Sequence, residues 1–145
     1  MSDYEEWTNG REEYVKVLFN ESYSIIRHSL AAVVNSGTAS LEVALIGTPQ
    51  VVAYKGMPIN FAIAKQIIKI TYISLGNLIL GRTCFRELIQ DYFTADNFLQ
   101  EVRRLLEDKE YRDNMLAGYA EIRQALGGTG ASAAVAEAMI AELSR

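Results

Sequence analysis

Four short apolar runs divide the first half of the chain, and more polar or amphipathic segments separate them. Runs rich in β-branched and aromatic residues predict strands. Continuous apolar runs such as 30–34 and 51–54 are typical of strands that are buried on both faces of a parallel sheet. The predicted strands are residues 14–19, 30–34, 51–54 and 72–75. The helices predicted between them are residues 21–28, 41–45 and 58–69.

The second half of the chain has the 3.6-residue periodicity of amphipathic helices. An apolar stripe that follows Thr94, the predicted N-cap, indicates one helix, and a stripe over 111–126 that closes at Gly127 indicates the next. An alanine-rich helix is expected from about Ser132 and should pack closely. Residues 76–81 are predicted to form a loop.

Strand and helix patterns alternate for about 80 residues, and helices follow. This order predicts an α/β fold: a Rossmann-like parallel sheet of the doubly wound type, with helices on both faces and a helical C-terminal tail. The 145 residues suffice for one domain. We expect residues 13–145 to form this domain after a flexible acidic lead-in, residues 1–12.

Charge is unevenly distributed along this acidic chain, whose formal net charge is −4. Residues 43–86 contain no acidic residue and five basic ones: Lys55, Lys65, Lys69, Arg82 and Arg86. Such a segment favours an anionic ligand or an anionic membrane surface, with a solvated charged face as the alternative. The predicted helix 58–69 either lies on a membrane surface or packs on the sheet. The acidic balance argues against a nucleic-acid partner.

The chain has one cysteine, Cys84, and one histidine, His28. This count excludes a disulfide framework within the chain and nearly excludes a Cys/His zinc site, so we expect no metal and no cofactor. Cys84 is expected to be a small buried residue and His28 to lie at a surface or at a helix C-terminus, and neither is predicted to be catalytic. No apolar stretch approaches the about 20 residues of a membrane span, and no signal peptide is evident, which favours a cytoplasmic setting.

The first candidate site lies at residues 35–42, where a predicted buried strand ends and a helix begins. The unpaired N–H groups and the dipole of a helix start form a site suited to phosphate. Gly37 lets a ligand approach the backbone, and Ser36 or Thr38 can add a hydroxyl. The alternative is that the two hydroxyl residues only cap the helix.

Glu42 is predicted in the first turn of this helix. Its carboxylate either interacts with the helix dipole or accepts two hydrogen bonds from a ribose diol. A nucleotide whose diphosphate rests on the helix start would place its ribose about one turn away.

The second candidate site is the glycine-flanked stretch around Asn77 and Arg82, with Glu87 and Gln90 after it. Arg82 offers a planar fork that suits a diphosphate or a carboxylate. The alternatives are that Asn77 forms a turn and that Arg82 is a solvated cation or a partner of Glu87.

Four segments, in this order and spacing, resemble the C-terminal half of the lipid-A-disaccharide synthase family. They are SGTASLE (36–42), GTPQVVAY (47–54), YISLGNLILGR (72–82) and ELIQ (87–90). The resemblance covers about residues 14–145. Two departures stand out: Gly76 replaces a proline that is usual in the family, so greater mobility is expected there, and residues 83–86 differ from the usual acidic and aliphatic pattern.

The resemblance implies the donor-binding half of an inverting glycosyltransferase of the GT-B fold. Such an enzyme transfers diacylglucosamine from UDP-2,3-diacylglucosamine to 2,3-diacylglucosamine 1-phosphate in lipid A biosynthesis. By resemblance, the helix start would face the diphosphate, Glu42 would hold the ribose, and the second group would line the same cleft. The implied donor-site residues are Ser36, Gly37, Thr38, Ala39, Glu42, Asn77, Arg82, Glu87 and Gln90.

In this family an acceptor-binding domain with the general base precedes the matching region. We therefore expect this chain to hold no catalytic residue, to bind UDP weakly and to catalyse nothing alone. The parent enzyme would be cytoplasmic and peripheral to the inner membrane, and an exposed cleft and apolar helices would favour a homodimer or segment exchange. The alternatives are a standalone nucleotide-binding or regulatory interaction module and the donor half of another GT-B UDP-sugar enzyme.

Overall fold

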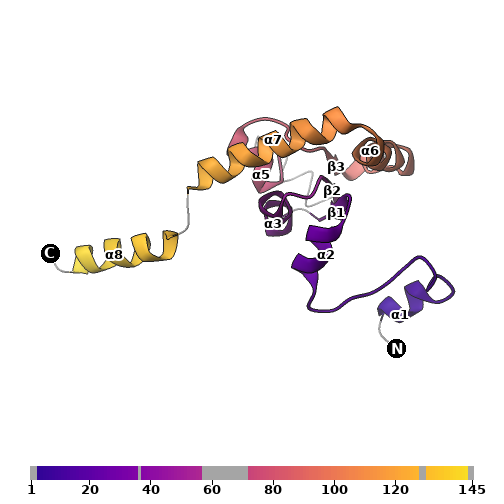
Figure 1. Ribbon diagram of the computed structural model, residues 1–145, viewed down its shortest axis with the longest axis horizontal. Coiled ribbons are helices and arrows are strands. Elements are labelled where there is room, and N and C mark those ends of the chain that lie inside the picture. The colour runs from indigo at the N-terminus through magenta and orange to yellow at the C-terminus, as the bar shows by residue number, and fades with distance from the viewer. Residues whose placement is uncertain (1–2, 36, 57–71, 128–129, 144–145) are drawn as a thin grey trace.

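The computed structural model describes residues 3–35, 37–56, 72–127 and 130–143 (Figure 1). The elements in chain order are α1 (Asp3–Thr8), α2 (Ser22–His28), β1 (Ala32–Val34), α3 (Thr38–Ile46), β2 (Gln50–Tyr54), α5 (Leu75–Leu80), β3 (Glu87–Ile89), the 3-10 helix η1 (Gln90–Tyr92), α6 (Ala95–Glu107), α7 (Lys109–Leu126) and α8 (Ala131–Leu143). The predicted helix 58–69 lies outside the described residues. None of the described helices is both long enough and apolar enough to cross a membrane.

The described strands form a parallel sheet in the order β1-β2-β3. Val34 of β1 is level with Val52 of β2, and Val52 is level with Glu87 of β3. Parallel strands end at the same edge of a sheet, so the segments that follow Val34, Tyr54 and Ile89 all leave from one edge. The prediction of a parallel sheet is therefore confirmed for these three strands.

The core is built around β2, in which the successive residues Val51 and Val52 are both fully buried. Successive side chains of a strand point to opposite faces, so both faces of β2 are covered. In Figure 1, α3 and α5 lie on one side of the strands and α6 lies on the other. The buried cluster comprises Ala44, Val51, Val52, Cys84, Phe85, Leu88, Leu105, Met115, Tyr119 and Ile122.

Helix α3 connects β1 to β2 and is anchored at its C-terminal end. Gly47 ends the helix in the left-handed conformation, with φ of 102°. Arg123 of α7 donates from Nε and Nη2 to the carbonyl of Leu45, at 3.2 and 3.0 Å. The guanidinium thereby pairs with carbonyl groups that a helix end leaves unsatisfied, and its charge complements the negative end of the dipole.

The strand predicted at 14–19 is wrong, because the structure has no strand there. The segment is irregular, and its apolar side chains are largely exposed, as Phe19 is at 67%. A strand needs a neighbour to satisfy its backbone groups, and among the described residues none pairs with this segment. Part of the expected lead-in, 3–8, is helical as α1.

The strand predicted at 72–75 and the loop predicted at 76–81 are also wrong, because Leu75–Leu80 forms α5. Gly76 is buried in this helix, where an added Cβ would lie 2.8 Å from the ring of Phe85. The two departures from the family pattern thus contact each other, since the ring of Phe85 fills the space beside Gly76. The strand β3 was not predicted.

The remaining helices follow the pattern closely. The hydroxyl of Thr94 accepts a hydrogen bond from the N–H of Asn97 at 3.2 Å, so the predicted N-cap of α6 is confirmed, and α7 ends at Gly127 as expected.

At the edge of the described sheet, β1 is covered less than predicted, because Val33 is 50% exposed. The close packing expected of α8 is wrong, since its apolar side chains are exposed, Leu143 at 86%.

The contact between Gly118 and Cys84 gives a test of the core. A Cβ at Gly118 would lie 2.4 Å from the Sγ of Cys84, so Gly118→Ala is expected to destabilise the protein by about 1–3 kcal/mol through overpacking. Urea denaturation followed by circular dichroism measures this loss. Adding Cys84→Ala removes the sulfur and should recover part of it. If the two substitutions destabilise the protein additively, the proposed contact is wrong.

Candidate functional site

The turn after β1 places a glycine at the start of α3. Gly37 is the N-cap of the helix, with φ of 120° and ψ of −153°, a region that essentially only glycine adopts. A Cβ built at Gly37 would meet no atom of the described residues within 4 Å. Among the described residues nothing would obstruct a ligand at this backbone, and its approach stays a prediction. Ser36 lies outside the described residues.

The first residues of α3, Thr38 and Ala39, are exposed beside this turn. Thr38 is the first helical residue and not the N-cap, so the alternative that Thr38 caps the helix is wrong. The N-cap Gly37 has no side chain to pair with the N–H groups of the first turn. Such groups, with the positive end of the dipole, suit a phosphate or another anion.

Two buried residues that sequence reasoning missed support this helix start. The hydroxyl of Ser40 donates to the carbonyl of Gly37 at 2.8 Å, and the Nε2 of Gln50 donates to the carbonyl of Ser40 at 2.8 Å. Both side chains are fully buried. Their role follows from their burial, which the sequence pattern does not show. Together they connect the Gly37 peptide to Gln50, the first residue of β2.

Glu42 is exposed and is the fifth residue of α3. The expectation that it lies in the first turn is wrong, because the helix begins at Thr38 and its first turn holds no acidic residue. The carboxylate is therefore one turn beyond the open N-terminus. That spacing leaves the proposed contact with a ribose as a prediction, and it weakens the alternative of a dipole contact, which acts within the first turn.

Asn77, in α5, is fully buried, and its amide is fully paired. Its Nδ2 donates to the carbonyl of Phe85 and to Oε1 of Glu87, each at 2.9 Å. Its Oδ1 accepts from the N–H of Cys84 at 2.7 Å and from that of Phe85 at 3.3 Å. A primary amide has two donors and two acceptor positions, so Asn77 has none left for a ligand.

Glu87 is half-buried at the start of β3, and its carboxylate faces the chain that enters α5. Oε2 accepts from the N–H of Ile73 at 2.9 Å, and Oε1 accepts from the N–H of Ser74 at 3.1 Å. Oε1 also accepts from the hydroxyl of Ser74 and from Asn77. Glu87 therefore ties β3 to the N-terminal end of α5.

Arg82 lies at the surface and pairs with Glu121 of α7 at 2.6 Å. The alternative that it pairs with Glu87 is therefore wrong. The hydrogen bond to Glu121 raises the pKa of the Arg82 guanidinium above its usual value. About half of each side chain is exposed, so the pair contributes little to stability, and the guanidinium can exchange it for an anion.

Cys84 is buried next to this arginine, as predicted for a small core residue. Burial raises the pKa of its thiol to about 11, although the charge of Arg82 opposes this shift. The thiol therefore stays protonated at neutral pH, which does not suit a nucleophile.

Gln90 directly follows β3, and its amide is paired with the backbone that follows β2. Its Oε1 accepts from the N–H of Gly56 at 3.1 Å, and its Nε2 donates to the carbonyl of Gly56 at 3.2 Å. Gln90 adopts φ of 51°, which is unusual for a residue other than glycine. The pairing joins the carboxyl ends of β2 and β3 at the edge from which the turn at Gly37 also leaves.

The register brings Glu87 and Gln90 of the second predicted group toward the end of the sheet where the turn at Gly37 begins, whereas Arg82 precedes β3 and pairs with α7. Val34, which precedes the turn at Gly37, is level with Glu87 across β2. Two strand spacings of about 4.8 Å put the outer strands roughly 10 Å apart. This separation suits groups that bind different parts of one nucleotide. Among the described residues, no cluster of His, Cys, Asp or Glu could hold a metal ion.

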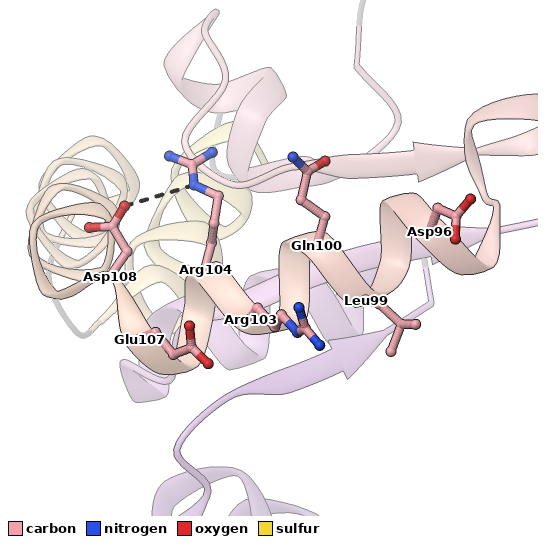
Figure 2. A pocket seen from close by; sticks show the side chains of 7 residues that line it. All are labelled: Asp96, Leu99, Gln100, Arg103, Arg104, Glu107 and Asp108. Atoms are coloured by element: carbon pink, nitrogen blue, oxygen red, sulfur yellow. Dashed lines mark ion pairs between the residues drawn. The ribbon is translucent and has the colours of Figure 1, made fainter.

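A hollow of about 570 Å³ lies elsewhere, along one face of α6. Figure 2 shows its lining side chains along the helix, with Arg104 directed at Asp108. The lining residues are Asp96, Leu99, Gln100, Arg103, Arg104, Glu107 and Asp108. None of the predicted site residues is among them, and the mixed charges do not favour one class of ligand.

Backbone conformation at Gly37 can be tested by comparison with Gly81, since an added Cβ meets no described atom within 4 Å at either position. Gly37→Ala is expected to cost about 1–3 kcal/mol of stability, because alanine avoids its φ and ψ. Gly81 has φ of 64° and ψ of 14°, so Gly81→Ala should cost only about 1 kcal/mol. Urea denaturation of both variants makes the comparison. Equal losses, or no loss at Gly37, would refute the backbone conformation given to this turn.

The comparisons with known proteins agree with the resemblance in the sequence. The family described as lipid-A-disaccharide synthetase matches residues 3–140. The lipid-A-disaccharide synthase of Acidobacterium capsulatum is 40% identical over 113 residues, which are 78% of this chain and 28% of that protein. The enzyme of the same name from Trichlorobacter lovleyi is 37% identical over 129 residues, 89% of this chain and 34% of that protein. That of Syntrophotalea carbinolica is 37% identical over 131 residues, 90% of this chain and 33% of that protein.

The chain thus spans about a third of the length of these curated relatives. The match nevertheless covers nearly all of the chain, from the exposed N-terminal helix to α8. It includes both groups of predicted site residues. The chain therefore belongs to the lipid-A-disaccharide synthetase family.

Proposed function

We propose that this chain is the UDP-sugar donor-binding part of a lipid-A-disaccharide synthase. In the reaction that we propose for the whole enzyme, diacylglucosamine passes from UDP-2,3-diacylglucosamine to 2,3-diacylglucosamine 1-phosphate with inversion, and UDP leaves. The observation that carries the proposal is the open start of α3 at Gly37, at the carboxyl edge of the sheet, in a chain of this family. Ligands of parallel α/β sheets bind at that edge.

The diphosphate of the donor is the group that fits the helix start. Its charge is complementary to the dipole of α3, and its oxygens can accept from N–H groups of the first turn, near Gly37, Thr38 and Ala39. Ser36 belongs to the same proposed set. The exposed Glu42, one turn further on, would accept from the two ribose hydroxyls. Stabilising UDP in this way also favours its departure in the transition state.

The second group of residues is proposed to border the same cleft from β3. Arg82 has an exposed guanidinium that can turn from Glu121 to an anionic part of the donor. Asn77, Glu87 and Gln90 hold the chain around β3 through the hydrogen bonds described above. This division of roles supports a Rossmann-like donor domain of the GT-B type, with residues 13–145 as one unit and helices on both faces of the sheet.

The acceptor, the general base and the membrane contact belong to the whole enzyme in this proposal. A chain with about a third of the length of its relatives would supply the donor site and depend on an acceptor domain for catalysis. We place the enzyme in the cytoplasm, peripheral to the inner membrane where acylated substrates reside. The exposed apolar side chains of α8, among them Val135, Met139 and Leu143, support a homodimer.

A titration with UDP, by calorimetry or NMR, tests the donor site. The chain should bind UDP saturably and weakly. Glu42→Ala should weaken binding by about tenfold or more, because a carboxylate that accepts hydrogen bonds from the ribose is lost. Glu110→Ala controls for the loss of one negative charge, since Glu110 is also exposed and lies on another helix, α7.

Three outcomes would count against parts of this proposal. Absence of saturable binding at millimolar UDP would refute a donor site within this chain. Equal affinities for the wild-type chain and Glu42→Ala would remove the ribose contact and keep the domain. Equal weakening by Glu110→Ala would show that net charge, and not a contact of Glu42, changes the affinity.

A further inference from the structure

We propose that Asn77 is a positioning residue of the donor site: it contacts no ligand and acts by fixing Glu87 and the backbone of residues 84–85. The inference deepens the proposed function and rests on it. It reassigns a residue whose place in the sequence motif indicates direct contact with the donor. The reason is that the amide is fully buried and that all of its donor and acceptor positions are paired within the protein.

The pairing of Asn77 with the chain before β3 is unusually complete. One amide accepts from two successive N–H groups, of Cys84 and Phe85, and donates to the carbonyl of Phe85. These backbone groups lie outside regular structure, so no helix or strand supplies partners for them. Without Asn77 they would be buried and unpaired, which is costly. A donor could reach Asn77 only by breaking this set.

The fourth bond of Asn77 orients a charged group. Its Nδ2 donates to Oε1 of Glu87 at 2.9 Å, the oxygen that also accepts from Ser74. Because Glu87 is level with Val34 across the sheet, the carboxylate lies at the end where the turn at Gly37 begins. Asn77 thus fixes Glu87 at one border of the proposed cleft, although Asn77 itself is buried and does not line the cleft.

Asn77→Asp tests this role because it keeps the shape and replaces the donating amide with a carboxyl group. Next to Glu87, two carboxylates cannot both ionise cheaply, so the pair takes up a shared proton and its pKa rises in the folded state. A raised carboxyl pKa means that stability is kept at low pH and lost as the pH rises through the folded pKa. Asn77→Ala removes all four bonds and gives no such pH dependence.

Two arginines close to Glu87 in the described part of the chain are already paired. Arg86, next to Glu87, pairs with Glu101 of α6 at 3.4 Å, and Arg82 pairs with Glu121 of α7 at 2.6 Å. The thiol of Cys84 has its pKa raised to about 11 by burial, so it stays neutral across the range of interest. A pH effect specific to Asn77→Asp between about pH 5 and pH 8 therefore reports the new pair.

The experiment measures melting temperature and UDP affinity at pH 5.5 and pH 8 for the wild-type chain, Asn77→Asp, Asn77→Ala and Asn114→Asp. Asn114 is exposed on α7, so its variant controls for the same change of charge. At pH 8, Asn77→Asp should melt roughly 5 °C or more below the control and bind UDP more weakly. At pH 5.5 it should regain part of both. Dividing each UDP affinity by the wild-type affinity at the same pH removes the effect of the titration of UDP itself.

Hydrogen exchange at the amides of Cys84 and Phe85 separates positioning from contact. Asn77→Ala should lose protection there with and without UDP. If both variants bound UDP poorly while their melting temperatures and this protection matched the wild type, Asn77 would contact the ligand and the proposal would be overturned. If Asn77→Asp showed no pH effect on stability, the pairing with Glu87 would be refuted. If the wild-type chain did not bind UDP, the proposed function would fail, and the melting and exchange data would still decide the pairing.

Discussion

The fold depends on the burial of β2, whose residues Val51 and Val52 have no exposed surface. A strand with both faces buried must be covered on both sides, and so short a sheet can be stable only if helices supply the cover. Parallel pairing also requires a crossover between neighbouring strands, and α3 is the one between β1 and β2. The same constraint that packs α3 on the sheet therefore places its N-terminal end at the carboxyl edge, beside Gly37.

Hydrogen bonds from polar side chains to the backbone then hold these helices in place. Arg123 of α7 pairs with carbonyls at the C-terminal end of α3, and Gln50 holds the carbonyl of Ser40 near its start. Asn77 does the same for the chain before β3. The hydrogen bonds of Gln50 and Asn77 satisfy backbone groups in the buried interior, so losing one of these partners costs more than the bond itself. These hydrogen bonds surround the edge of the sheet at which we propose that a ligand binds.

Local pattern predicted the elements that depend on it: the long helices α6 and α7 and the central strand. It failed where contacts distant in sequence decide. Residues 14–19 have the composition of a strand, yet no described strand pairs with them. The strand β3 has only three residues, Glu87–Ile89, and so short a run shows no periodicity that would mark a strand in the sequence. Glycine flanks indicated a loop at 76–81, whereas Leu75–Leu80 is helical and Gly76 lies against Phe85 within it. At the candidate site, the motif around Gly37 was visible in the sequence, but the support from Gln50 was not.

The two candidate groups differ in how they can serve a ligand, and exposure explains the difference. Thr38, Ala39 and Glu42 are exposed around a helix start whose N-cap has no side chain, so a ligand can reach them without displacing protein contacts. Asn77, by contrast, is enclosed, and its hydrogen bonds hold the strand that borders the same edge. A site that binds a flexible nucleotide gains affinity when its own parts need no ordering on binding. Under the proposed function, residues that fix the frame would therefore contribute to binding through the entropy they have already removed, and the sequence motif would combine them with the residues that touch the ligand.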